Sequence, residues 1–213
     1  MSEASAGQRR RYHHGDLRHA LIEAAVGLAR ENGPEAIVLR EAARRVGVTP
    51  TAAYRHFSAL PDLVAEVAAI ASTTLADSME DEVARCRPSG DSGQDAWNEM
   101  RAVGRGYIHF ALHEPGLFTT AFTTAKRAAG DPPGTGRSGL SPRGLLERSL
   151  DRLVATGMLA EADRQAASVT AWAVVHGLSI LLLDRMIGLP PAARDTLIEA
   201  TLDMIGSGLL SRD

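Results

Sequence analysis

The chain of 213 residues has a single cysteine, Cys86. One thiol can form neither a disulfide within the chain nor a thiolate cluster for a metal, as expected of a protein in a reducing cytosol. The longest apolar stretch, residues 171–183, is interrupted by His176, Gly177 and Ser179. It is shorter than the about 20 residues that a membrane span needs. The polar N-terminus shows no signal-peptide pattern, so we expect a cytoplasmic protein without a membrane segment.

Motifs typical of enzymes are also absent from the sequence. It has no glycine-rich phosphate loop and no nucleophile elbow around a serine, and Cys86 has no plausible histidine partner. Two histidine pairs, His13 with His14 and His109 with His113, are close enough in sequence to suggest a metal. Neither pair is joined by the third and fourth ligands that a metal site needs. The sequence therefore predicts no enzyme, no cofactor and no bound metal.

The overall composition is ordinary for a soluble globular protein, but the charge is unevenly distributed. Hydrophobic residues make up 45% of the chain and charged residues 23%, and the net charge is -3. Residues 1–60 contain nine arginines and six acidic residues, a net charge of +3, and the remainder carries -6. A basic N-terminal part on an acidic body favours nucleic-acid binding by the first part and a separate function for the second.

Hydrophobic residues recur with helical spacing along the chain, and no alternating strand pattern interrupts them. In the first helix, predicted over residues 16–31, Leu17, Leu21 and Leu28 share one face. The fold class is therefore predicted to be all-α. Further helices are expected over residues 39–46, 50–56, 62–86, 95–113, 117–125, 143–156, 162–187 and 192–210, with a glycine- and proline-rich loop over 128–142.

Residues 38–57 combine two short helices with a tight turn. Ala43 is small enough for a close helix crossing, Gly47 permits a positive φ, and Val48 supplies an apolar contact after the turn. Thr49 is a suitable N-cap for the second helix, and Pro50 suits its first position. This arrangement predicts a helix-turn-helix whose second helix enters the major groove of DNA. The alternative is an ordinary tight corner between two helices.

The side chains expected to contact double-stranded DNA lie on and around the second short helix. Thr51 and Ala52 are placed to read bases, and Tyr54 and His56 to donate to phosphates. A basic arm before the first helix would reach the minor groove. The complete set of candidate DNA-binding residues is Arg9, Arg10, Arg11, Arg40, Thr49, Thr51, Ala52, Tyr54, Arg55 and His56.

Residues 12–63 resemble the DNA-binding domain of the TetR family of bacterial transcriptional regulators, notably in LREAARRVGVTP (39–50) and YRHF (54–57). The sequence departs from the family pattern at two places. Val38 stands where members usually have a serine or threonine cap, and Leu60 and Pro61 stand where they usually have a phosphate-binding lysine. A lost cap costs about 1 kcal/mol, and Pro61 has no backbone N–H to offer a phosphate.

The C-terminal part resembles family members with a Trp-His-Gly ligand-binding domain, because Trp172, His176 and Gly177 stand in one predicted helix. The resemblance implies a helix-turn-helix domain over residues 1–60 and a helical ligand-binding and dimerisation domain over residues 61–213. It also implies a homodimeric repressor that is released from a palindromic operator by a small-molecule effector. The competing interpretation is a helical enzyme or ligand carrier whose N-terminal module is only structural.

Bulky apolar and amphipathic residues on the helices of the second domain are candidates for the effector pocket, although each could equally belong to an ordinary core. The charged neighbours Glu99, Arg101 and Arg105 are expected at other helical angles, which favours an apolar effector with few charges. The two C-terminal helices are expected to pair with their copies across a twofold axis, because the apolar residues 169–183 need burial on more than one face. The candidate ligand-binding residues are Trp97, Met100, Tyr107, Phe110, Phe118, Phe122, Trp172 and His176.

Overall fold

A computed structural model describes residues 14–123 and 134–209, and all regular secondary structure in these ranges is helical. The predicted all-α fold class is confirmed. The basic arm with Arg9, Arg10 and Arg11 lies outside the described residues. The helices are α1 (His14–Asn32), α2 (Leu39–Val46), α3 (Pro50–Tyr54), α4 (Leu60–Ala84), α5 (Ser92–His113), α6 (Pro115–Thr123), α7 (Pro142–Ala155), α8 (Arg164–Leu183) and α9 (Pro191–Leu209), with short 3-10 turns η1 (Pro34–Ala36) and η3 (Glu161–Asp163).

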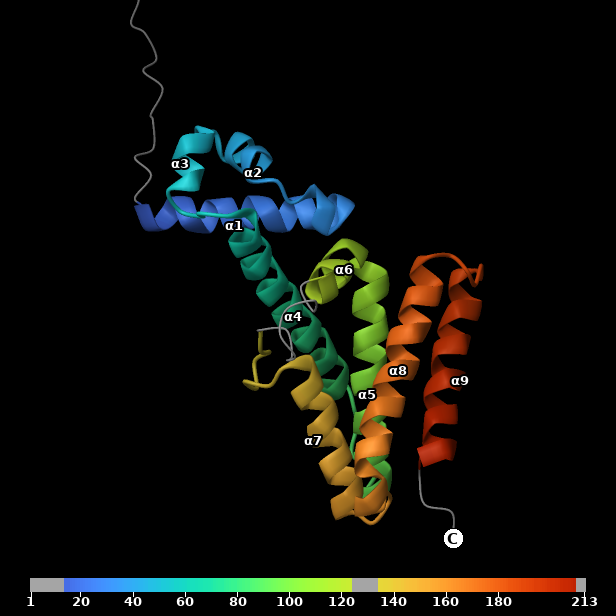
Figure 1. The fold of residues 1–213 in the computed structure, drawn as a ribbon. Coiled ribbons are helices and arrows are strands. Elements are labelled where there is room, and N and C mark those ends of the chain that lie inside the picture. Colours follow the sequence, from blue (N-terminus) through green and yellow to red (C-terminus); the bar gives the residue numbers. More distant parts are fainter. Residues whose placement is uncertain (1–13, 124–133, 210–213) are drawn as a thin grey trace, which may run out of the picture.

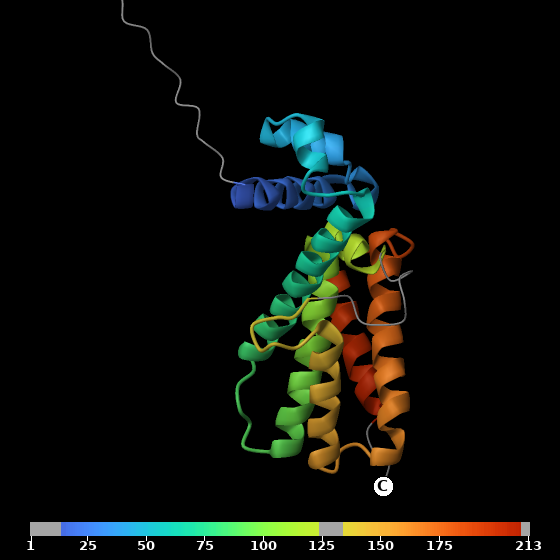
Figure 2. The same ribbon diagram turned by 60° about the vertical axis from the view of Figure 1, so that its left-hand side comes forward.

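The helices form two regions joined by α4 (Figure 1). We call residues 14–59 the head and the described residues from 60 onward the body. Helices α1, α2 and α3 form the head, and α4 leaves it and runs along the bundle of the body, as the turned view also shows (Figure 2). Within the body α4 packs on α5, α6 and α7, and α5 also packs on α8 and α9. The domain boundary predicted after residue 60 falls in the first turn of α4, a helix that both regions share.

Local interactions explain why the head helices begin and end where they do. Gly47 ends α2 with a left-handed φ of 78°, a conformation that most side chains disfavour. The hydroxyl of Thr49 accepts a hydrogen bond from the backbone N–H of Ala52, 3.3 Å away, at the start of α3. Val38 provides no side-chain cap for α2, as the sequence indicated.

Two helix ends in the body differ from their predicted positions by three or four residues. Helix α5 begins at Ser92 rather than residue 95, because the Asp91 carboxylate accepts hydrogen bonds from the N–H groups of the next turn, at 2.8 and 3.0 Å. Helix α8 ends at Leu183 instead of residue 187, because Arg185 takes a left-handed φ of 54°. Arginine seldom takes a left-handed conformation, so the residue type gave no signal for this earlier end.

The expectation that no segment is long enough for a membrane span needs correction. Residues Glu161–Leu183 are long and apolar enough by length and composition, and 39% of their most apolar window is buried within the protein. The sequence argument counted only residues 171–183, whereas the helix also includes apolar residues before that stretch. One such helix is weak evidence for a membrane, and α8 packs on α5, α7 and α9.

The head and the body touch where α5 turns into α6. A side chain at Gly116 would overlap the backbone carbonyl of Ala29 near the end of α1, so only glycine allows this close approach. Beside it, Nε of Arg30 donates to both carboxylate oxygens of Glu114, at 3.1 and 3.2 Å. The start of α6 is therefore packed directly against the head.

Candidate functional site

The two short helices of the head meet closely and present α3 to solvent. Ala43 on α2 and Ala53 on α3 are fully buried, which lets the helices approach without intervening side chains. Phe57 is buried beneath the end of α3, where the guanidinium of Arg18 lies 5.1 Å from its ring centre. In Figure 1, α2 and α3 lie on the side of α1 that faces away from the body. This is the geometry of a helix-turn-helix whose second helix is free to enter a groove of DNA.

The candidate DNA-binding residues of the described head differ in exposure. Arg40, Thr51 and Arg55 are exposed, and Tyr54 is 52% exposed with its hydroxyl available to a phosphate. Ala52 and His56 are half-buried and Thr49 is exposed, and Thr49 also caps α3.

The arginines of the head fall into two groups. Arg44 forms a bidentate pair with Glu41, at 2.7 and 2.8 Å, and Arg45 forms one with Glu31, at 2.6 and 2.9 Å. Within the described ranges, Arg40 and Arg55 form no ion pair. Their charges are uncompensated locally, which makes them the better candidates for phosphate contacts.

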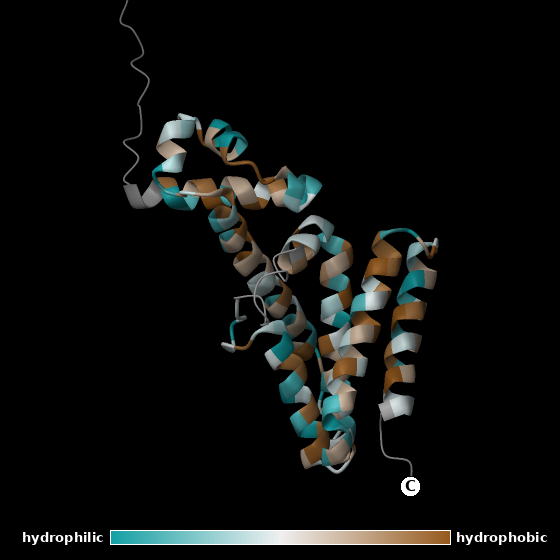
Figure 3. Cartoon of the chain, viewed as in Figure 1, coloured by the Kyte–Doolittle hydropathy of each residue, from teal (hydrophilic) through white to brown (hydrophobic). Residues whose placement is uncertain are grey.

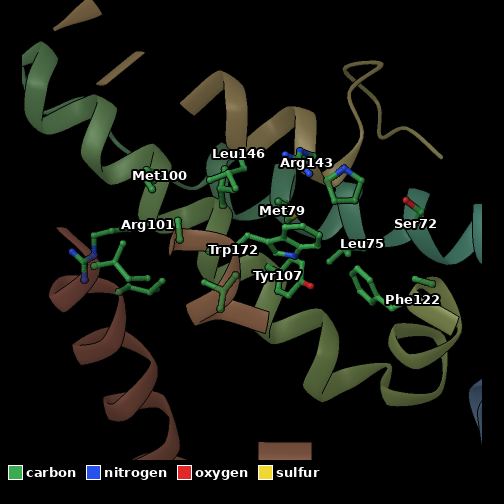
Figure 4. A pocket seen from close by; sticks show the side chains of 18 of the residues that line it. Ser72, Leu75, Met79, Met100, Arg101, Tyr107, Phe122, Arg143, Leu146 and Trp172 are labelled. Carbon is green, nitrogen blue, oxygen red and sulfur yellow. The ribbon is translucent and has the colours of Figure 1, made fainter. Parts of the chain in front are cut away.

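The body contains a partly open cavity of about 560 Å³, a size typical of small-molecule sites. Side chains from six helices, α4 to α9, line it, and most of them are apolar (Figure 4). The lining consists of Ser72, Leu75, Met79, Trp97, Met100, Arg101, Val103, Gly104, Tyr107, Ala121, Phe122, Pro142, Arg143, Leu146, Ala171, Trp172, Val175, Leu202 and Ile205.

Of the eight candidate pocket residues, five line this cavity: Trp97, Met100, Tyr107, Phe122 and Trp172. The other three do not. Phe110 and Phe118 are buried among the core helices, and Phe118 makes an edge contact with Tyr107 at a ring-centre distance of 5.5 Å. His176 packs against the rings of Tyr107, Phe118 and Phe122 without reaching the cavity lining.

A hydrogen-bonded pair lies behind the aromatic wall of the cavity. The Tyr107 hydroxyl and Nδ1 of His176 are 2.8 Å apart. Burial raises the pKa of Tyr107, and a hydrogen bond with Trp172 acts against that rise. Burial also lowers the pKa of His176, which favours the neutral imidazole, and in either neutral tautomer this ring can share a hydrogen bond with the Tyr107 hydroxyl through Nδ1. Since these two groups satisfy each other, they help to hold the wall without needing a ligand.

The expected absence of charge at the cavity is wrong for Arg101. This residue follows Trp97 by one helical turn and therefore shares its face, a spacing from which its position could have been predicted. Glu99 is instead buried outside the cavity, where Arg148 and Arg152 pair with it, and Arg105 pairs with Glu199.

Sequence reasoning also missed Arg143, a second arginine of the lining. Its guanidinium carbon lies 5.5 Å from the ring centre of Trp172. No periodicity signals this contact, because it depends on how α7 packs against α8.

These two regions define a class of protein, the helix-turn-helix transcriptional regulators with a separate helical domain. Two family models support this assignment. Bacterial regulatory proteins of the tetR family match residues 21–67, and the tetracyclin repressor-like C-terminal domain matches residues 100–205. One model describes the N-terminal part and the other the C-terminal domain of proteins of the same family, and together they cover most of the chain. The protein belongs to the TetR family of bacterial transcriptional regulators.

The chain is also similar to individual proteins and solved structures. An uncharacterized HTH-type transcriptional regulator of Bacillus subtilis, YobS, is 29% identical over 101 residues, and the match spans 47% of this chain and about half of that relative (49%). A Rhodococcus sp. RHA1 protein of unknown function has 25% identity and a TM-score of 0.75, over 95% of this chain and 100% of its own. The TetR family regulator PfmR of Thermus thermophilus shares the fold, with 20% identity and a TM-score of 0.56 over 90% and 99% of the two chains.

Proposed function

We propose that the protein is a ligand-responsive repressor that binds a palindromic operator as a homodimer. A small, largely apolar molecule in the body cavity would release it from DNA. The observation that supports this proposal is the position of α4 and α6. Both helices line the cavity, through Leu75 and Phe122 among others, and both pack against α1 of the head. A ligand that prefers one position of these helices would shift the head between two arrangements, because it binds one of them more tightly.

An exposed apolar surface on α8 and α9 supports the homodimer. Hydrophobic segments recur along both helices, in contrast to the hydrophilic α2 (Figure 3). A surface of this kind calls for a partner, and a twofold contact between copies would cover it on both chains at once. The exposed large side chains are Val169, Trp172, Ile180 and Leu181 on α8, Met204 on α9, and Met186 and Leu189 in the connection between the two helices.

Twofold symmetry also explains the proposed form of the operator. Two α3 helices related by a twofold axis read inverted half-sites in successive major grooves. We place the protein in the cytoplasm, where the DNA is, and propose no cofactor and no enzymatic activity.

A gel-shift experiment with DNA from upstream of the protein's own gene tests the proposal. We expect binding that survives an excess of unrelated competitor DNA. The matched variant Thr51→Ala, at an exposed position of α3, should keep the fold and change the preference among operator sequences. Loss of all binding in the presence of competitor would support the ligand carrier or enzyme instead.

A further inference from the structure

We infer that the body cavity binds an amphipathic monocarboxylate, with its apolar part among the aromatic side chains and its carboxylate at the guanidinium of Arg143. This inference rests on the proposal that the cavity is the effector site, and it specifies the chemical class of the effector. The lining contains two guanidinium groups, those of Arg101 and Arg143, and no carboxylate from the described part of the chain.

The two arginines differ in how far their charge is already neutralised. Nη2 of Arg101 lies 2.8 Å from the carboxylate of Glu199 and 3.0 Å from that of Asp203. The corresponding acidic neighbour of Arg143 is Glu147, whose Oε1 lies 3.7 Å from Nε of Arg143, beyond hydrogen-bond distance. Arg143 therefore retains most of its capacity to bind an anion.

Glu147 itself is occupied by other partners. One of its oxygens lies 2.8 Å from Nη1 of Arg164, and the other accepts a hydrogen bond of 2.6 Å from the Ser168 hydroxyl. Because these contacts are shorter than the one to Arg143, a ligand carboxylate would not have to displace a strong ion pair.

Contact with Trp172 also holds the side chain of Arg143 at the cavity lining. Arg143 is the second residue of α7, and its guanidinium lies over the indole of Trp172, as Figure 4 shows. A cation–π contact of this kind restricts the guanidinium, and its N–H groups can still donate to a carboxylate. Its side chain is about half exposed, so a carboxylate could bind there without complete loss of its hydration.

The rest of the lining fits an apolar ligand body. The Tyr107 hydroxyl is paired with His176, and the aromatic walls offer apolar surface. A cationic ligand would find no counter-ion in this lining, and leaving its charge unpaired is unfavourable.

Decanoate, decanamide and decylamine form a matched series of negative, neutral and positive probes. Both tryptophans of the chain, Trp97 and Trp172, line the cavity, so quenching of intrinsic fluorescence reports its occupancy, and calorimetry gives an independent dissociation constant. We expect decanoate to bind at least about tenfold more tightly than either analogue, the factor that a partly exposed charge-assisted hydrogen bond supplies.

Variants of Arg143 identify the group responsible. Arg143→Met keeps an apolar stem over Trp172 and should abolish most of the preference for decanoate over decanamide, whereas Arg143→Lys should retain part of it. The control Arg85→Met removes the same charge from a side chain that is 69% exposed and outside this cavity, and should leave the preference unchanged. The inference is overturned if decanoate binds no more tightly than its analogues or does not bind at all, or if Arg143→Met preserves the preference.

The same samples distinguish this inference from the proposed function. Release of operator DNA by decanoate is measured separately from its binding to the cavity. Tight binding that depends on Arg143 but does not release DNA would support the ligand class and contradict the effector role.

Discussion

The head and the body use their side chains in opposite ways. In the head, the side chains proposed to contact DNA point outward from a small core, and Tyr54 and Arg55 contribute little to its packing. In the body, the side chains proposed to contact a ligand point inward, and Tyr107 and Met100 are also part of the core. Function in the head is therefore separable from stability, whereas function in the body is closely tied to it.

The connection between the regions is narrower than either of them. It consists of the continuous α4, which packs on α1, of the contacts of α6 with α1 and η1, where Gly116 lies against Ala29, and of the Arg30–Glu114 pair. Substitutions at different places in the head and the body should therefore affect different properties: folding, dimer assembly, DNA binding or the pH dependence of stability.

The largest effect is expected from Phe118→Ala in the body. Phe118 is 1% exposed, and truncating a buried aromatic side chain removes its burial energy and leaves a cavity. We expect the free energy of unfolding to fall by about 3–5 kcal/mol. Chemical denaturation measures this free energy. The folded fraction of the Phe118→Ala variant should bind DNA almost as tightly as wild type. A loss below about 1 kcal/mol would contradict the assignment of Phe118 to the core.

Leu181→Asp is expected to have the next largest effect, on assembly. Leu181 is 38% exposed on α8, and a carboxylate there would become buried and unpaired in the proposed dimer. Dimer dissociation should become at least about tenfold more favourable, and DNA binding should weaken with it. Analytical ultracentrifugation measures the first effect. The neighbouring Leu182 is only 8% exposed, so Leu182→Asp should instead unfold the body. Unchanged dimerisation of the Leu181→Asp variant would place the interface elsewhere.

A smaller effect is expected from Tyr54→Phe in the head. The substitution removes one exposed phosphate donor and leaves the ring, so binding to operator and to unrelated DNA should weaken by a similar amount, about 0.5–1.5 kcal/mol. Fluorescence anisotropy with both DNAs measures the two losses, and the melting temperature should not change. A loss confined to the operator would mean that Tyr54 reads bases.

The smallest effect concerns pH. Burial lowers the pKa of His176 from the usual 6.5, so the unfolded chain takes up this proton first as the pH falls. Stability should therefore decrease as the pH falls below about 6.5, and the loss should stop once the pH is below the pKa of the folded state. His176→Asn offers a similar acceptor to Tyr107 and should weaken this pH dependence. Denaturation curves between pH 5 and 8 give the free energy of unfolding of wild type and of the His176→Asn variant. If this free energy has the same dependence on pH in both proteins, His176 is excluded as the cause.

Much of the head could be predicted from the sequence because its signals are local. Helix α2 spans the predicted residues, since Gly47 permits the left-handed end that the pattern required. Helix α3 was predicted two residues too long, and its Thr49 cap was predicted correctly.

The body was less accessible to sequence reasoning because its features depend on packing between helices. The position of Arg143 over Trp172 is set by the approach of α7 to α8, and residues 29 apart in sequence leave no periodic signal. The end of α8 depends on the conformation of Arg185, which its residue type does not suggest. The list of candidate pocket residues includes five that line the cavity, but the sequence could not separate them from Phe110 and Phe118, because core and cavity walls have the same composition.

The central claim is that α3 of two heads reads DNA sequence. Selection of tightly bound DNA from a random pool by the full chain tests it most directly, with sequencing of the retained fragments. The account predicts enrichment of an inverted repeat whose half-sites lie about one helical turn apart or a multiple of that, and an altered half-site for Thr51→Ala. Fragments retained without any shared sequence, or with one unrepeated site, would contradict it.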